Sequence, residues 1–144
     1  MKNISRWGDL ERYGIDCLTG EACGLGYRLL CDVTAKGKRT LERVFDCQLT
    51  LSRPWNSGGC SDPHIGCIMM APEMLTVVGA FALLEYGCTE VWLVKGKLMG
   101  VDASDDKDEV ERWREANYGD IQQVFSYRGT ASDRNTHTMS GRER

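Results

Sequence analysis

The chain has 144 residues, 42% hydrophobic and 27% charged, a composition typical of a globular protein that can bury a core without disulfides. Its net charge of −3 argues against a general nucleic-acid binder, which needs a basic surface, and falls short of the acidic excess of a DNA mimic. Residues 1–14 contain no apolar signal segment, so we expect a cytoplasmic protein whose seven cysteines are mostly free thiols.

The spacing of apolar residues predicts that the first third of the chain is helical. A short helix is expected over residues 5–13, because large apolar side chains recur there at three-residue steps, and Gly14 suits its end. A second helix is expected over "TGEACGLGYRLLCDV" (19–33), where three glycines would allow another helix to approach closely. Thr34 is predicted to cap a third helix over 36–46, with its apolar side chains facing the core.

The middle of the chain alternates between strand and helix patterns. "CQLTL" (47–51) alternates apolar and polar residues, which is typical of a half-buried strand, and "HIGCIMM" predicts a buried strand over about 65–70. The apolar run that follows is expected to form a helix over 72–86, with proline at its first position and Gly87 after its end. The proline and Glu73 shorten this run below the length of a membrane span, so no membrane partner is expected.

The last third is predicted to contain a hairpin and a helix. Strands over 90–95 and 97–102 flank Lys95-Gly96, a pair suited to a tight turn. Ser104 is expected to cap a helix whose acidic residues occupy the positive end of the helix dipole. "DIQQVFSY" fits a last strand or a last helical turn, and residues 128–144, almost devoid of apolar residues, are expected to form a flexible tail.

These elements predict a single α+β domain over residues 1–127. Its helical N-terminal region is expected to pack on a small mixed sheet, with the central apolar helix 72–86 covering one face. The strands of that sheet are 47–51, 65–70, 90–95 and 97–102. Because a helix connects the strands 65–70 and 90–95, these two are expected to be parallel.

One segment, "NSGGCSDPHIGC", carries two thiols and an imidazole within eight positions, at Cys60, His64 and Cys67. These groups are ligands that zinc accepts, and a structural site needs a fourth; a water in the fourth place would indicate a catalytic site. The fourth ligand would be one of the other cysteines, Cys17, Cys23, Cys31, Cys47 or Cys88. The spacing is not that of the usual zinc knuckles, and free cysteine is a common core residue, so we expect no cofactor, with zinc as the alternative.

The same segment offers a nucleophile pair in which Cys60 attacks and His64 acts as general base. Cys60 would need a neighbouring cation or helix start to lower its pKa. His64 is the only histidine in 1–127, because His137 lies in the tail, and no third residue that would orient it can be identified. Catalysis is therefore not the favoured interpretation.

Trp55 lies in a polar loop between Arg53 and Asn56, a composition found at interface hot spots. The alternative is that its indole folds back over the core. We predict a small non-enzymatic protein that binds another protein, an inhibitor or accessory factor of the kind that phages and mobile elements encode, with a homodimer as one option. The alternatives are a zinc or thiol enzyme built on the cysteine–histidine segment, and a small-ligand sensor with a pocket between the sheet and the N-terminal helices.

Overall fold

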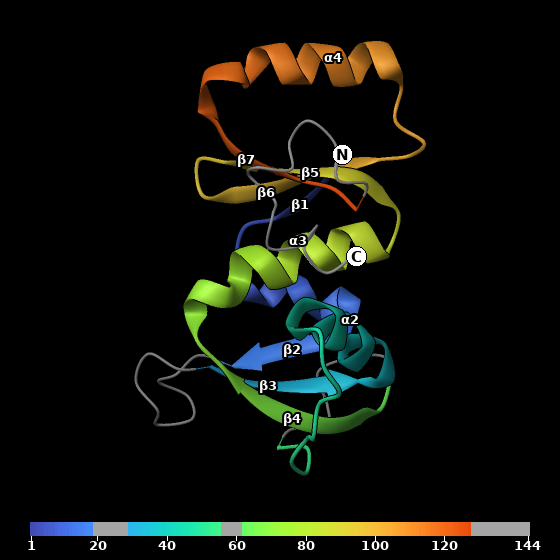
Figure 1. The fold of residues 1–144 in the computed structure, drawn as a ribbon, viewed down its shortest axis with the longest axis vertical. Helices are drawn as coiled ribbons and strands as arrows, with labels where there is room; N and C mark the ends of the chain where they lie inside the picture. The colour runs from blue at the N-terminus through green and yellow to red at the C-terminus, as the bar shows by residue number, and fades with distance from the viewer. Residues whose placement is uncertain (19–28, 56–61, 128–144) are drawn as a thin grey trace. The chain divides into compact units, whose positions relative to one another are not determined.

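The structure is a computed structural model that describes residues 1–18, 29–55 and 62–127. Its contacts divide the chain into two compact units, Arg6–Ala82 (the N-terminal unit) and Met1–Ser5 with Leu83–Arg144 (the C-terminal unit). Each unit holds one antiparallel sheet with helices beside it (Figure 1). The predicted α+β class is confirmed, but two antiparallel sheets replace the single mixed sheet. A single domain over 1–127 stays a prediction, and the predicted tail lies outside the described residues.

The sheet of the N-terminal unit contains β2 (Ile15–Leu18), β3 (Leu29–Thr34) and β4 (His64–Met70), in that order. β3 is the central strand and pairs antiparallel with both neighbours. One face of the sheet is the core face, where side chains such as Ile15 are completely buried. The helix α2 (Ala35–Phe45) packs on this face.

Two glycines allow α2 to approach the chain just before β2. The 3-10 helix η1 (Trp7–Tyr13) ends at Gly14, whose φ of 87° is left-handed. A Cβ at Gly37 of α2 would collide with the Gly14 carbonyl oxygen, so a larger residue would separate the two elements. The hydroxyl of Thr34 accepts the Gly37 N–H at 3.2 Å. The predicted Thr34 cap and the short helix ending at Gly14 are confirmed.

Two predictions for the N-terminal unit are wrong. Residues 29–33, predicted to end a helix, belong to β3, because the run "LLCDV" is apolar enough to be buried on both faces of a sheet. The other residues of that predicted helix from 19 to 28 lie outside the described part of the chain. Residues 47–51 form no strand. There the N–H of Leu49 donates to the Glu42 carboxylate at 3.0 Å instead of to a neighbouring strand.

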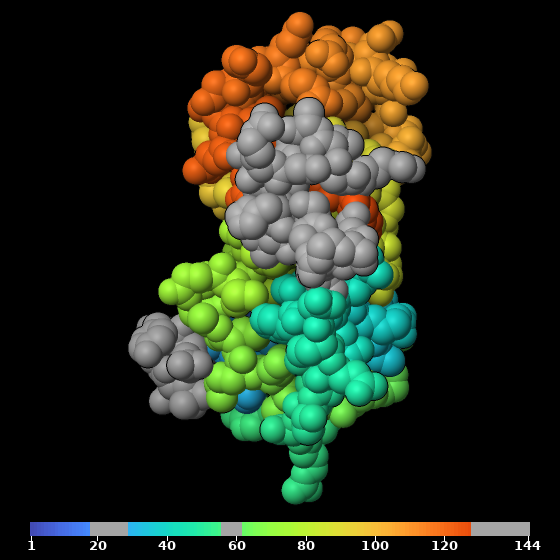
Figure 2. Space-filling model, viewed as in Figure 1, coloured from blue at the N-terminus to red at the C-terminus, as the bar shows by residue number. Residues whose placement is uncertain are grey.

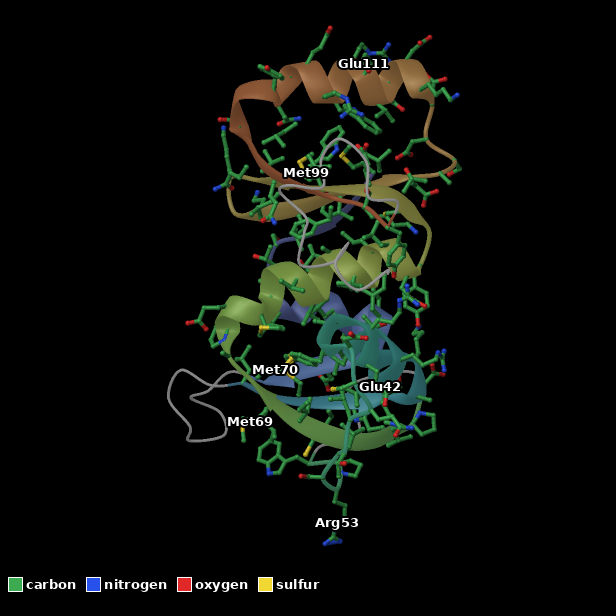
Figure 3. The ribbon with its side chains drawn as sticks, viewed as in Figure 1. Glu42, Arg53, Met69, Met70, Met99 and Glu111 are labelled. Atoms are coloured by element: carbon green, nitrogen blue, oxygen red, sulfur yellow. A yellow bond between two sulfur atoms is a disulfide. The ribbon has the colours of Figure 1, made fainter. Side chains whose placement is uncertain are left out.

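The sheet of the C-terminal unit has the order β1-β6-β5-β7 and is antiparallel throughout. Its strands are β1 (Lys2–Ile4), β5 (Cys88–Val94), β6 (Lys97–Asp102) and β7 (Ile121–Phe125). The helix α4 (Lys107–Ala116) lies over one face of this sheet (Figure 1). Figure 3 shows Met99 between the sheet and α4, and Glu111 on the outer side of the helix.

Local chemistry explains the turns of this unit. The predicted hairpin between β5 and β6 is confirmed, with left-handed φ values of 51° at Lys95 and 79° at Gly96. The predicted cap of α4 is wrong, because Asp106 and not Ser104 accepts the N–H of Glu109 at 3.0 Å. Ser104 is already engaged, since both its N–H and its hydroxyl donate to Asp102 Oδ1 at 2.9 Å.

The predicted apolar helix is confirmed as α3 (Leu75–Glu85), which a short 3-10 helix, η2 (Pro72–Met74), precedes. The boundary between the two units falls inside α3, between Ala82 and Leu83. β4 and β5, the strands on either side of the helix, therefore belong to different sheets, and their predicted parallel pairing is wrong. None of the helices in the described part of the chain combines the length and the apolar character that crossing a bilayer requires.

Candidate functional site

A bulge in β4 brings three functional side chains to one face of the N-terminal sheet. Residues three apart on a strand normally point to opposite faces. Here Cys67 is paired with Asp32 and His64 with Thr34, and the register shifts between these two pairs. Asp32 and Thr34 are two apart on β3 and share a face, so His64 and Cys67 share it too. We call the face that Asp32, His64 and Cys67 share the polar face.

Asp32 and His64 form a buried pair on the polar face. Their side chains are 1% and 0% exposed, and Asp32 Oδ2 lies 3.8 Å from His64 Nδ1. The other carboxylate oxygen, Oδ1, accepts the backbone N–H of Trp55 at 2.9 Å. A buried carboxylate is stable only when such partners compensate its lost hydration. Asp32 therefore ties the main chain of Trp55 to the central strand of the sheet.

Residues 52–55, which we call the strap, are fixed at three points. Ser52 and Cys67 exchange two backbone hydrogen bonds, of 3.0 and 2.9 Å. The Cys67 thiol donates to the Arg53 carbonyl oxygen at 3.0 Å, and Trp55 is held by Asp32. Figure 2 shows the teal-green segment that contains the strap at the surface of the N-terminal unit. The main chain of the strap thus has a defined position over the polar face.

Large apolar side chains are exposed on the strap and on β4. Trp55 is 58% exposed and Met69 is 41% exposed, and Ile65 at the bulge is also exposed. Met69 and the buried Met70 lie on opposite sides of β4 (Figure 3). The Arg53 guanidinium points away from the sheet (Figure 3). Because more than half of the Trp55 side chain is exposed, its indole does not fold into the core. We call Trp55, Ile65 and Met69 the Trp55 surface; Asn56 lies outside the described residues.

Only two of the three predicted zinc ligands, His64 and Cys67, lie within the described residues. Cys60 lies outside the described residues, as does Cys23, so zinc binding stays a prediction. In the part of the chain that the structure describes, no three His, Cys, Asp or Glu side chains are arranged to hold a metal. Cys17 and Cys31 are joined by a disulfide, which removes both from the candidates for a fourth ligand.

The chemical state of Cys67 does not favour nucleophilic catalysis. Burial, and then the negative charge of Asp32, raise the pKa of the Cys67 thiol above its ordinary value. The thiolate is the reactive form of cysteine, and Cys67 instead donates its S–H to a carbonyl oxygen. The composition Asp32–His64–Cys67 resembles a catalytic set, but the cysteine is held as a thiol. The predicted pairing of Cys60 with His64 is untested.

We expect alkylation to rank the described cysteines by exposure and pKa. Burial raises the pKa of Cys88 to about 11, whereas Cys47 is exposed. Because a raised pKa lowers the thiolate fraction at a given pH, iodoacetamide at pH 8 should modify Cys47 at least about tenfold faster than Cys67 or Cys88. Peptide mass spectrometry measures the three rates. Equal rates in the native protein, or a fast Cys67, would contradict the assignment of Cys67 as a held thiol.

The C-terminal unit has a cleft of about 410 Å³ between α4 and the ends of β5 and β6. The small-ligand prediction placed its pocket against the N-terminal helices, whereas this cleft lies against a C-terminal helix. Several of its carboxylates already bind protein groups: Lys2 lies 3.0 Å from Asp102, and Trp92 donates to Glu90 at 2.8 Å. The lining residues are Thr89, Glu90, Val101, Asp102, Ala103, Asp105, Lys107, Val110, Glu111 and Arg114.

Sequence reasoning found Trp55, Arg53, His64 and Cys67 but missed Asp32. A signal was present, because Asp32 is the one charged residue in the apolar run of β3. An acid in such a run must find compensating partners when it is buried. Its partners come from 23 and 32 positions away in sequence, so spacing alone could not name them.

No family model, no curated protein and no solved structure matches this chain. The function is therefore inferred from the geometry of the chain's own residues, and the Trp55 surface is the candidate site.

Proposed function

We propose that this chain is a protein-binding module whose contact centre is Trp55. One observation carries the proposal: a buried carboxylate fixes the main chain of Trp55, while its indole is left exposed. A side chain of this size gains free energy when it is buried. Placing it on an anchored strap prepares the surface for a partner that provides a pocket for the indole.

The surroundings of Trp55 agree with this role. Tryptophan and arginine are enriched among the residues that dominate binding energy, and Arg53 lies two positions from Trp55. Met69 adds a flexible apolar side chain that adapts to the shape of a partner. Because the main chain of the strap is already fixed, binding avoids part of the entropy cost of ordering a loop, about 1–2 kcal/mol for each residue whose backbone would otherwise be ordered on binding.

The partner we propose is another polypeptide with an apolar pocket and a nearby carboxylate for Arg53. The chain would then act as an inhibitor or accessory factor of that partner. A second copy of this chain is the alternative partner, which the test of self-association below distinguishes. Affinity would come from burying the indole, with the charge pair contributing to orientation.

Replacing Trp55 with alanine should weaken partner binding by about 10- to 100-fold without unfolding the protein. Affinity capture from the host lysate, with wild type and variant side by side, identifies polypeptides that depend on Trp55. Calorimetry with the purified polypeptide then measures the affinity. The melting temperature should stay within about 2 °C, because the exposed indole contributes little to the core.

The matched control is Tyr118→Ala, which removes an aromatic side chain that is 80% exposed on the C-terminal unit. It should bind as wild type does. The proposal fails if no polypeptide binds in a Trp55-dependent manner, or if Tyr118→Ala reduces binding equally. Sedimentation of the chain alone tests self-association; a Trp55-dependent dimer would replace the proposed partner with a second copy.

A further inference from the structure

The Cys17–Cys31 disulfide joins β2 to β3 at directly opposed positions. The two Cα atoms are 4.0 Å apart. Such a short distance is typical of a directly opposed pair that exchanges no backbone hydrogen bonds. The backbone hydrogen bonds between β2 and β3 therefore lie at the neighbouring pairs, Asp16–Asp32 and Leu18–Leu30. Among the described strands, β2 pairs only with β3 and is therefore an edge strand. Cys31 is completely buried, while Cys17 is partly exposed. Cys17 is therefore the less buried of the two half-cystines.

The pair next to the disulfide brings two acids together. Asp16 on β2 is directly opposite Asp32 on β3. Like charges at directly opposed positions destabilise an antiparallel pair. The burial of Asp32 places this repulsion in a region that salt screens weakly. Residues 16–18 of β2 are therefore paired with β3 against an electrostatic cost.

The start of β2 is held by contacts that do not involve the disulfide. Ile15 is completely buried and lies close to Gly37 of α2. The Thr34 N–H donates to the Gly14 carbonyl oxygen at 3.0 Å. These contacts hold the start of the strand whether or not the disulfide is present. Beyond Ile15, the ladder hydrogen bonds of the two neighbouring pairs and the covalent bond at Cys17 oppose the repulsion between the two acids, and the covalent bond is the one of these that a reductant breaks.

We propose that the Cys17–Cys31 disulfide is a redox-sensitive latch that keeps Asp16–Leu18 paired with β3. When the latch is reduced, Asp16–Leu18 separates from β3 while Ile15 stays in place. The main-chain groups of Asp32 that faced Asp16 are then available to another strand. Because Asp32 also holds the strap, the latch acts at the base of the Trp55 surface, but its release is measurable whether or not that surface binds a partner.

The reductant is a dithiol, and the reaction is thiol–disulfide exchange. One thiolate of the reductant attacks the sulfur of Cys17, the less buried cysteine, the Cys17–Cys31 bond breaks, and the Cys31 sulfur leaves as a thiolate that takes up a proton. The second thiolate of the reductant then attacks the reductant sulfur that is bonded to Cys17. Cys17 leaves as a thiolate, which takes up a proton. The reductant becomes a cyclic disulfide, and the protein gains two thiols.

Hydrogen exchange in the full chain tests the latch. Mass spectrometry first verifies the Cys17–Cys31 bond in the oxidised protein; its absence would overturn the proposal. After reduction with dithiothreitol, the Asp16 and Leu18 amides should exchange at least about tenfold faster. The amide of Val91 on β5 should be unchanged. Equal exchange in both states overturns the proposal. Faster exchange at Val91 also overturns it, because the disulfide would then stabilise the whole fold and not residues 16–18 alone.

Two variants complete the test. Cys17→Ser should reproduce the fast exchange without any reductant, which excludes effects of dithiothreitol on other cysteines. Asp16→Asn removes the opposing charge and should slow the exchange of Leu18 in the reduced protein by up to about fivefold. If Asp16→Asn has no effect in the reduced state, repulsion is not what opens the strand, and the proposal in this form is wrong.

Discussion

Replacing Asp32 with alanine should lower the free energy of unfolding by about 2–4 kcal/mol. The substitution removes the acceptor of the Trp55 N–H and the carboxylate beside His64, and the side chains of Asp32 and His64 are 1% and 0% exposed. Part of the loss is offset, because the repulsion from Asp16 disappears as well. Urea denaturation measures the change in stability. The Trp55 amide should also exchange faster with solvent, because the strap has lost one of its three attachments.

Two variants separate the causes. Asp32→Asn keeps an oxygen that can accept the Trp55 N–H, so it should cost less than alanine and leave Trp55 closer to its native exchange rate. Asp16→Asn makes the same change of charge on the same face but removes no bond to the strap, so stability should be unchanged or slightly increased. If Asp32→Ala lies within about 0.5 kcal/mol of wild type, Asp32 is not the anchor of the strap.

Short-range chemistry explains the elements that the sequence predicted correctly. A threonine before a helical run caps that helix wherever the helix packs, as Thr34 does for α2. Lys95-Gly96 adopts left-handed φ values that close a hairpin without distant contacts. These predictions depend on neighbours within a few residues, and the rest of the fold does not alter them.

The partition into two sheets could not be predicted in the same way. The run in β3 is apolar at most positions and has neither a clear strand period nor a clear helix period. A helix between β4 and β5 suggested one parallel sheet, but that inference assumes that both strands join the same sheet. Nor did three residues at the N-terminus, Lys2–Ile4, signal that they would pair with β6.

The candidate site also has one part that the local sequence indicates and one part that depends on distant contacts. Composition placed Trp55 in a polar loop but left open whether its indole is exposed or folds back over the core, and the structure places it at the surface. The anchor was not predictable, because it depends on the bulge that puts His64 and Cys67 on one face. With regular alternation, residues three apart would face opposite sides, and one of these two would leave the polar face. A single inserted residue in the register decides the composition of the site.

Replacing Trp92 with alanine should be the most destabilising single change in the C-terminal unit, at about 3–5 kcal/mol. Trp92 is completely buried at the centre of β5 and forms a cluster with Val94 and Val101. Its Nε1–H donates to Glu90 at 2.8 Å, and the Arg114 guanidinium carbon lies 5.1 Å from the ring centroid. The loss combines a cavity under α4 with the disruption of this polar arrangement. Chemical denaturation measures the change in stability.

The position of the ring, and not the residue type, should determine this cost. Trp113→Ala removes the same side chain from α4, where it is only partly buried against the same cluster, and should cost less than Trp92→Ala. Trp92→Phe keeps most of the volume but loses the hydrogen bond to Glu90, so it should fall between wild type and Trp92→Ala. If Trp113→Ala costs as much as Trp92→Ala, the core is centred on the helix and not on β5. Cross-strand packing would then contribute less to this unit than the burial of Trp92 indicates.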